Sequence, residues 1–155
     1  MKFTINIPPE PQRRGKIVKI GKFSQIGRTE RQELAEGQLI SVLANHRPRT
    51  PMTGPLYLQV KAFLPIPKSF SKRKKAEAHG GILLMPIKTP DLSNLIKHLE
   101  DCMTKIGFWE DDSQVVAESL IKRYDDGAGP RWEILLITWD EFYLTSLARK
   151  NAIQA

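Results

Sequence analysis

A strongly amphipathic segment at residues 92–105 does most to constrain how this chain can fold. At about 100° per residue on a helix, its apolar side chains fall within one arc of about 120°. These side chains are Leu92, Leu95, Ile96, Leu99, Cys102 and Met103, continued by Ile106. Pro90 and Asp91 mark the start of the predicted helix, and Gly107 marks its end. Phe108 and Trp109 follow it, and we expect both to pack in the core.

The rest of the chain predicts a coarse alternation of strands and helices. Alternating or continuous apolar residues predict four strands, at residues 1–7, 56–64, 115–124 and 132–139. Residues 29–45 predict a second main helix, with Thr29 as its N-cap. Because only a turn at 125–130 separates the last two strands, we expect them to pair as a hairpin. The prediction is one α/β (α+β) domain over residues 1–155, in the order β-α-β-α-β-β, with a short helical tail at 140–155.

Two segments carry basic residues among glycines or prolines. Residues 12–28 predict a mobile loop or a weak hairpin. Residues 65–90 are a second long basic segment, in which residues 66–88 predict a mobile loop. The chain has 155 residues and a single cysteine, Cys102, so it forms no internal disulfide and suits a reducing, cytoplasmic location. It shows no signal peptide and no apolar run of about 18 residues, so we expect no membrane span.

The charge is distributed unevenly along the chain, whose formal net charge is +7. Residues 1–90 hold 17 Lys and Arg against 5 Asp and Glu, whereas residues 91–155 hold 7 against 12. A basic half offers phosphate contacts, and the asymmetry favours nucleic-acid binding over a purely solvated surface. The candidate DNA-binding residues are Arg13, Arg14, Lys72, Arg73, Lys74, Lys75 and Lys88.

The acidic half has residues suited to phosphodiester hydrolysis. Such chemistry needs a nucleophilic water and neutralisation of developing charge, which Mg²⁺ supplies when carboxylates hold it. Asp91 begins the helix, and Asp111 and Asp112 precede the next strand. Lys97, on the polar face of the helix, could stabilise a charged transition state. Each has a plain structural alternative: Asp91 as an N-cap, the Asp pair as turn residues, and Lys97 as the i,i+4 partner of Asp101.

One ungapped stretch resembles a known nuclease family. It reads Pro90-Asp91-Leu92-Ser93-Asn94-Leu95-Ile96-Lys97 and, after a short helix, Gly107-Phe108-Trp109-Glu110-Asp111-Asp112-Ser113-Gln114-Val115-Val116. This pattern is similar to the RusA family of crossover junction endodeoxyribonucleases. These are small homodimers, often borne by phages or prophages, that cut four-way (Holliday) DNA junctions with Mg²⁺. The resemblance implies a RusA-like mixed β-sheet, a homodimer with an acidic site in each subunit, a branched-DNA substrate and a role in recombination and repair.

The resemblance also implies roles for individual residues. Asp91 and Asp112 match catalytic, metal-binding aspartates, Lys97 matches the catalytic lysine, and Asp111 matches the neighbouring acid. The implied cofactor is Mg²⁺, with Mn²⁺ as a substitute. We expect no small-molecule cofactor and no membrane partner. Asp101 matches an acidic helix position. One departure concerns Ser93, where the family most often has a metal-binding Asp.

The departure at Ser93 leaves more than one function open. Glu110, Asp111 or Asp101 could supply the missing carboxylate, or metal affinity could be lower. An arginine that usually precedes the motif is also absent, and Lys88 is the nearest base. Alternatives to a junction resolvase are a non-catalytic branched-DNA-binding protein of the same fold and a nuclease for other branched DNA. An RNA-binding module has less support, because the chain lacks an RNP-like aromatic pattern and a GXXG loop.

Overall fold

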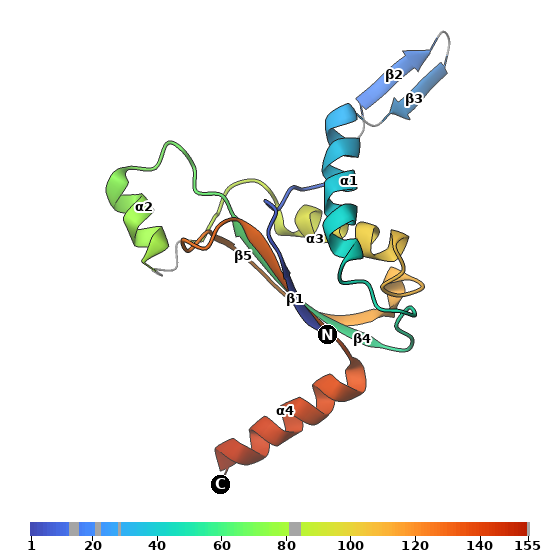
Figure 1. Ribbon diagram of the computed structural model, residues 1–155, viewed down its shortest axis with the longest axis vertical. Coiled ribbons are helices and arrows are strands. Elements are labelled where there is room, and N and C mark those ends of the chain that lie inside the picture. The colour runs from blue at the N-terminus through green and yellow to red at the C-terminus, as the bar shows by residue number, and fades with distance from the viewer. Residues whose placement is uncertain (13–15, 21–22, 28, 81–84, 155) are drawn as a thin grey trace.

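A four-stranded mixed sheet with helices packed on one face forms the body of the protein (Figure 1). The computed structural model describes residues 1–12, 16–20, 23–27, 29–80 and 85–154. The sheet contains β1 (Lys2–Ile5), β4 (Leu56–Leu64), β5 (Val115–Tyr124) and β6 (Arg131–Thr138), in the spatial order β1-β6-β4-β5. The α/β class and the mixed sheet agree with the sequence prediction, although the chain has helices beyond the two main ones.

Strand β4 lies at the centre of this sheet, and this corrects the predicted hairpin. It pairs with β5 in parallel along one edge and with β6 antiparallel along the other. Strands β5 and β6 are therefore separated by β4 and do not pair with each other. The physical reason is burial: β4 alternates buried and half-buried residues and ends in three buried ones, so both its edges need backbone partners.

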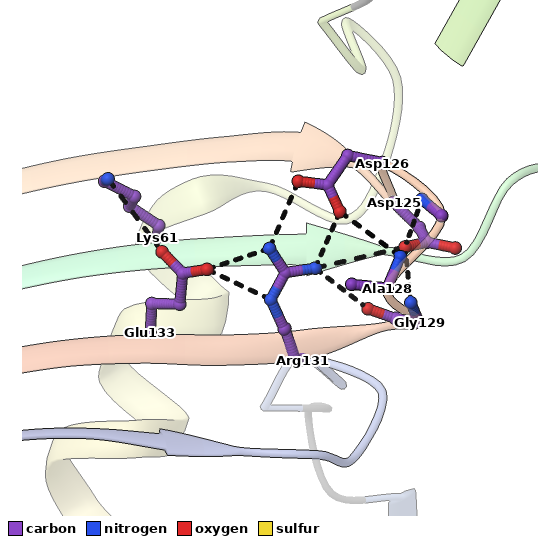
Figure 2. Close-up of polar contacts among 8 residues, drawn as sticks. Lys61, Asp125, Asp126, Ala128, Gly129, Arg131 and Glu133 are labelled. Carbon is purple, nitrogen blue, oxygen red and sulfur yellow. Dashed lines mark hydrogen bonds and ion pairs between the residues drawn. The ribbon is translucent and has the colours of Figure 1, made fainter. Parts of the chain in front are cut away.

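The connection between β5 and β6 passes over the end of β4 and is held by one arginine (Figure 2). Arg131 donates from both terminal nitrogens to Asp126, at 2.8 and 3.1 Å, and two further hydrogen bonds reach Glu133. Its guanidinium lies 3.5 Å from the ring centroid of Phe63 on β4. Asp125 donates its backbone N–H to Leu64 O at 2.8 Å, so the turn is also tied to β4 by the backbone.

The core lies between the sheet and two helices, α1 (Glu30–Ala44) and α3 (Leu92–Lys105). Both helices match the predicted spans closely, and α3 buries the apolar arc that defined it. Its buried residues are Leu95, Ile96, His98, Leu99, Cys102 and Met103. His98 lies outside the predicted apolar arc but is also buried, because α1 packs alongside α3 and leaves it only 8% exposed. Phe108 and Trp109 are buried in the core, as predicted.

Three further elements extend from this body (Figure 1). Strands β2 (Lys16–Ile20) and β3 (Phe23–Gly27) form an antiparallel hairpin, one of the two predicted alternatives for that segment. Helix α2 (Lys72–His79) forms where a mobile loop was predicted, so that prediction is wrong for these eight residues. Helix α4 (Trp139–Gln154) is the predicted helical tail and points away from the sheet. None of the described helices combines the length and apolar character that a bilayer-spanning helix needs.

Candidate nuclease site

Asp91 lies at the N-cap of α3, where its backbone oxygen accepts the first helical hydrogen bond from Leu95 N at 3.1 Å. Its carboxylate accepts a long hydrogen bond from Asn94 Nδ2 at 3.4 Å and does not cap the helix through its side chain. The backbone just before Asp91 is held by β5, because Lys122 Nζ donates to the carbonyls of Lys88 and Pro90 at 3.0 and 2.8 Å. The carboxylate is thus exposed on a well-supported backbone.

Lys97 lies on the polar face of α3 and forms an ion pair with Asp101. Its Nζ is 3.7 Å from Asp101 Oδ1, and its side chain is 61% exposed. Gln12 Nε2 also donates to Asp101 Oδ2, at 2.6 Å. The i,i+4 alternative weighed for Lys97 is therefore present in the structure. Exposed pairs of this spacing contribute only about 0.3–0.5 kcal/mol, so the lysine stays available to another anion.

Asp112 begins a single turn of 3-10 helix, residues Asp112–Gln114, that leads into β5, and Asp111 is the N-cap of this turn. Hydrogen bonds with the Ser113 side chain and with Ser113 N, the latter to Asp111 Oδ1 at 2.8 Å, hold the pKa of this carboxyl below its usual value. Gln114 Nε2 donates to the carbonyls of Met52 and Gly54, and this anchors the turn to the segment before β4. Glu110 donates its backbone N–H to Gln114 Oε1 at 2.9 Å, and its side chain is exposed.

A carboxyl pair that the sequence reading missed joins α3 to β5. Burial, followed by a hydrogen bond with the Glu118 carboxyl and the negative charges of Glu118, Asp112 and Asp101, raises the pKa of Glu100 to about 8. Glu118 comes from β5 on the face that carries the helices, since its register partner on β4 is the buried Leu58. The sequence held a signal for the position of Glu118: side chains alternate between the two faces of a strand, so Glu118 lies on the same face of β5 as Leu120.

These acidic residues do not form a complete metal cage. Among the residues that the structure describes, no three His, Cys, Asp or Glu side chains are grouped so that they could hold a metal ion. Asp91 lies at the first turn of α3. Asp112, in contrast, raises the pKa of Glu100, which lies nine residues after Asp91 and about 13 Å further along the helix axis. Ser93, exposed in the first turn, adds no carboxylate at the Asp91 end. An all-protein Mg²⁺ site is therefore not preformed.

The predicted DNA-binding residues lie in two places. Lys72, Arg73, Lys74 and Lys75 form the first half of α2, where Ser71 caps the helix by accepting from Lys74 N at 3.3 Å. Arg73 pairs with Glu77 at 2.8 Å. Lys88 is exposed three residues before Asp91, so the second place adjoins the start of α3. Arg13 and Arg14 lie outside the described residues.

Comparisons with known proteins show the family to which this chain belongs. Residues 6–136 match the family described as Endodeoxyribonuclease RusA, a span that begins directly after β1, ends within β6 and leaves α4 outside. One relative, the uncharacterized protein YqaN of Bacillus subtilis (strain 168), is 40% identical over 97 residues, which are 61% of this chain and 66% of that protein. The match thus spans slightly less than two thirds of that relative's length. The chain belongs to the RusA family of endodeoxyribonucleases.

Proposed function

We propose that this protein is a Mg²⁺-dependent endonuclease that resolves four-way DNA junctions by paired phosphodiester cleavage. The observation that carries the proposal is membership of the RusA family, together with the ungapped motif from Pro90 to Val116. The acids and the lysine of that motif lie on α3 and on the turn before β5, and their side chains are exposed or half-buried. They can therefore reach a bound DNA backbone.

In this proposal Lys97 acts as a point charge on the phosphate that is cut. Its present partner, Asp101, is a half-buried carboxylate one helical turn away, and the exposed ion pair is weak. A scissile phosphate that gains negative charge in the transition state is a stronger partner than a solvated carboxylate. Lys97 can exchange Asp101 for that phosphate by rotating its side chain, without any movement of α3.

The carboxylates Asp91, Asp111 and Asp112 are proposed as the metal-binding acids. Mg²⁺ is commonly held by one or two carboxylates together with water and substrate phosphates, rather than by an all-protein cage. The described residues fit that mode and not a three-acid cage. When bound, Mg²⁺ would neutralise charge on the scissile phosphate and lower the pKa of a bound water. The acids of the chain supply the fixed negative charge that attracts the metal, with Glu100 and Glu118 nearby.

Positive charge for the DNA arms comes from α2 and from Lys88. The first half of α2 carries four basic residues in succession, and three of them are exposed. Contacts of this kind position a duplex without reading its sequence, and they weaken steeply with salt. Two copies related by a two-fold axis would present two such sites, which suits paired cuts across a four-way junction. The homodimer is part of the proposal.

Cleavage of a synthetic four-way junction tests the proposal. The purified protein is incubated with the junction or with linear duplex of the same sequence, in Mg²⁺ or in EDTA. We expect nicks in the junction alone, and only with Mg²⁺. Equal cutting of the linear duplex would contradict junction resolution, and cutting in EDTA would contradict metal dependence.

A second candidate function is branched-DNA binding without cleavage. Two observations favour it: Ser93 replaces a carboxylate of the motif, and the described acids do not form a group of three. Ser93→Asp separates the two functions. If the natural protein binds junctions without cutting them and Ser93→Asp gains cleavage, the site of the natural chain is disabled. If the natural protein already cuts and Ser93→Asp changes the rate little, Ser93 is tolerated in an active enzyme.

A further inference from the structure

A groove beside the start of α3 has no role in the function proposed so far. It has a volume of about 890 Å³ and lies between the residues after β4, the first turn of α2, the residues before Asp91 and the end of β5. Its lining includes Phe70, Lys74, Lys88, Pro90 and Tyr124. We call it the Phe70 groove. Cavities of about 300–1,000 Å³ accommodate small organic ligands, so the groove has room for a nucleotide.

Two half-buried aromatic rings form part of the groove wall. The rings of Phe70 and Tyr124 meet edge to face, with centroids 5.2 Å apart and planes at 73°. Tyr124 is the last residue of β5, on the face that packs against the helices, because its register partner is the buried Leu64. Most of the other lining residues are apolar, among them several prolines. Such a wall offers a flat face on which a heterocyclic base can stack, whatever its sequence.

Positive charge surrounds the same groove. Lys74 Nζ lies 4.8 Å from the centroid of the Phe70 ring, and Lys88 is exposed and also lines the groove. Glu10 also contributes to the lining, so the groove is not uniformly basic. The neighbouring Lys72 and Lys75 on α2 add to the positive potential. Proteins that bind single-stranded nucleic acids combine aromatic side chains with a positively charged groove in this way.

The groove adjoins the start of the predicted catalytic helix. Pro90 lines it, and the next residue is Asp91. The wall formed by residues 88–90 is fixed to β5 by the two hydrogen bonds from Lys122 Nζ, at 3.0 and 2.8 Å. A strand held in the groove would therefore lead directly to Asp91, and its position would be set by the sheet.

We infer that the Phe70 groove takes one unpaired nucleotide of the DNA strand next to the scissile phosphate. The base stacks on Phe70, and Lys74 and Lys88 contact the flanking phosphates. A base leaves the duplex stack at the smallest energetic cost where pairing or stacking is already interrupted, as at a branch point. Binding of such a base in the groove would therefore favour branched over linear DNA. This inference rests on the proposed function, because the ligand class follows from it.

The test measures binding in EDTA, so that it does not depend on cleavage. The probe is a four-way junction with 2-aminopurine next to the branch point, beside a linear duplex with the same label. Phe70→Leu keeps an apolar side chain in the groove but removes the stacking face, and Lys74→Gln is a surface change that leaves the ring in place. Tyr143→Leu is the matched control, because Tyr143 is 53% exposed on α4, which lies apart from α2 (Figure 1). Melting curves of all variants verify folding.

We expect the natural protein and Tyr143→Leu to change the 2-aminopurine fluorescence of the junction but not that of the duplex. Phe70→Leu should lose this signal and bind the junction about five-fold or more weakly, with unchanged duplex affinity. Lys74→Gln should weaken junction binding while keeping the fluorescence change. Junction affinity and fluorescence that are unchanged in Phe70→Leu would overturn the inference and leave the nuclease proposal standing. A stacking signal that depends on Phe70, in a protein that cuts no DNA, would support the groove while contradicting the nuclease.

Discussion

Lys97 Nζ lies 3.7 Å from Asp101 Oδ1, so the lysine expected to act in catalysis is already paired with an acid of its own helix. Asp101 has a second contact, from Gln12 Nε2 at 2.6 Å, which holds the carboxylate in place when Lys97 leaves it. The pair therefore behaves as a resting position for the lysine. It keeps Lys97 on the face of α3 that also carries Ser93 and Glu100, since these residues are spaced by three or four positions.

Removing the charge of Lys97 should abolish cleavage with little loss of DNA binding. Lys97→Met is expected to lower the single-turnover rate on a junction about 100-fold or more, because charge stabilisation in the transition state is lost. Junction affinity should change less than about three-fold, as one surface cation among many is removed. The control is Lys105→Met, which removes a lysine that pairs with Glu36 near the end of the same helix. A Lys97→Met rate within a few-fold of the natural protein's would exclude this role.

The Glu100–Glu118 pair should make stability fall as pH rises. Burial and the neighbouring carboxyl raise the pKa of Glu100 from 4.5 to about 8, so the folded state binds a proton that the unfolded state releases. This contribution is fully present below about pH 4.5 and is lost as pH rises towards about 8. Glu100→Gln keeps a hydrogen-bond donor without needing that proton. We expect its Tm to exceed that of the natural protein at pH 9 by more than at pH 5.

Thermal melts between pH 5 and pH 9 measure this difference. The control is Glu33→Gln, which replaces an exposed glutamate on α1. Parallel Tm curves for the natural protein and Glu100→Gln would show that the pair does not share a proton.

Arg131 should be among the most sensitive positions for stability. Its side chain is only 10% exposed and contacts Asp126, Glu133 and the ring of Phe63 (Figure 2). Arg131→Ala removes the cation that pairs with Asp126 and leaves Glu133 with the more distant Lys61, and it should lower the free energy of unfolding by about 3 kcal/mol. Arg131→Lys should also be destabilising, because an ammonium cannot donate to both carboxylates in the planar geometry of a guanidinium. Urea titration provides the measurement, and Arg123→Ala, a more distant neighbour of Phe63, is the control.

The basic face of α2 should determine how strongly DNA binding depends on salt. Lys72→Gln combined with Lys75→Gln is expected to reduce the slope of log affinity against log salt by about 2, since each phosphate contact contributes about 0.9. Lys2→Gln combined with Lys61→Gln removes the same charge from the sheet face opposite the helices, where Lys61 pairs with Glu133. Fluorescence anisotropy over a range of salt concentrations gives both slopes. Equal slopes for the two double variants would show that α2 does not contact DNA.

Local periodicity explains which elements could be predicted from the sequence. The helix at α3, the strand at β4 and the capping of α1 by Thr29 all follow from patterns within a few residues, and the structure agrees with them. Gly107 ends α3 with a φ of +77°, a conformation that favours glycine. The resemblance to RusA, carried by the ungapped motif, was confirmed by the family match.

Long-range pairing explains what the sequence did not reveal. A short turn between two strands usually predicts a hairpin, but no local signal showed that β4 would lie between β5 and β6. Helix α2 has a run of basic residues and one buried residue, Ala78, so it has no apolar stripe to recognise. The contact of Glu100 with Glu118 depends on how α3 lies across the sheet. The catalytic and metal-binding roles of Asp91, Lys97, Asp111 and Asp112 remain predictions.

Mapping of cuts on a four-way junction tests the central claim most directly. Each strand of the junction is labelled in turn and incubated with Mg²⁺ and either the natural protein or Asp112→Asn, and the products are sized. Our account predicts one nick in each of two opposing strands, at positions related by the two-fold symmetry of the junction, and none with Asp112→Asn. Tight junction binding with no cut in any strand, under Mg²⁺ or Mn²⁺, would contradict the account and leave a protein that binds junctions without cleaving them.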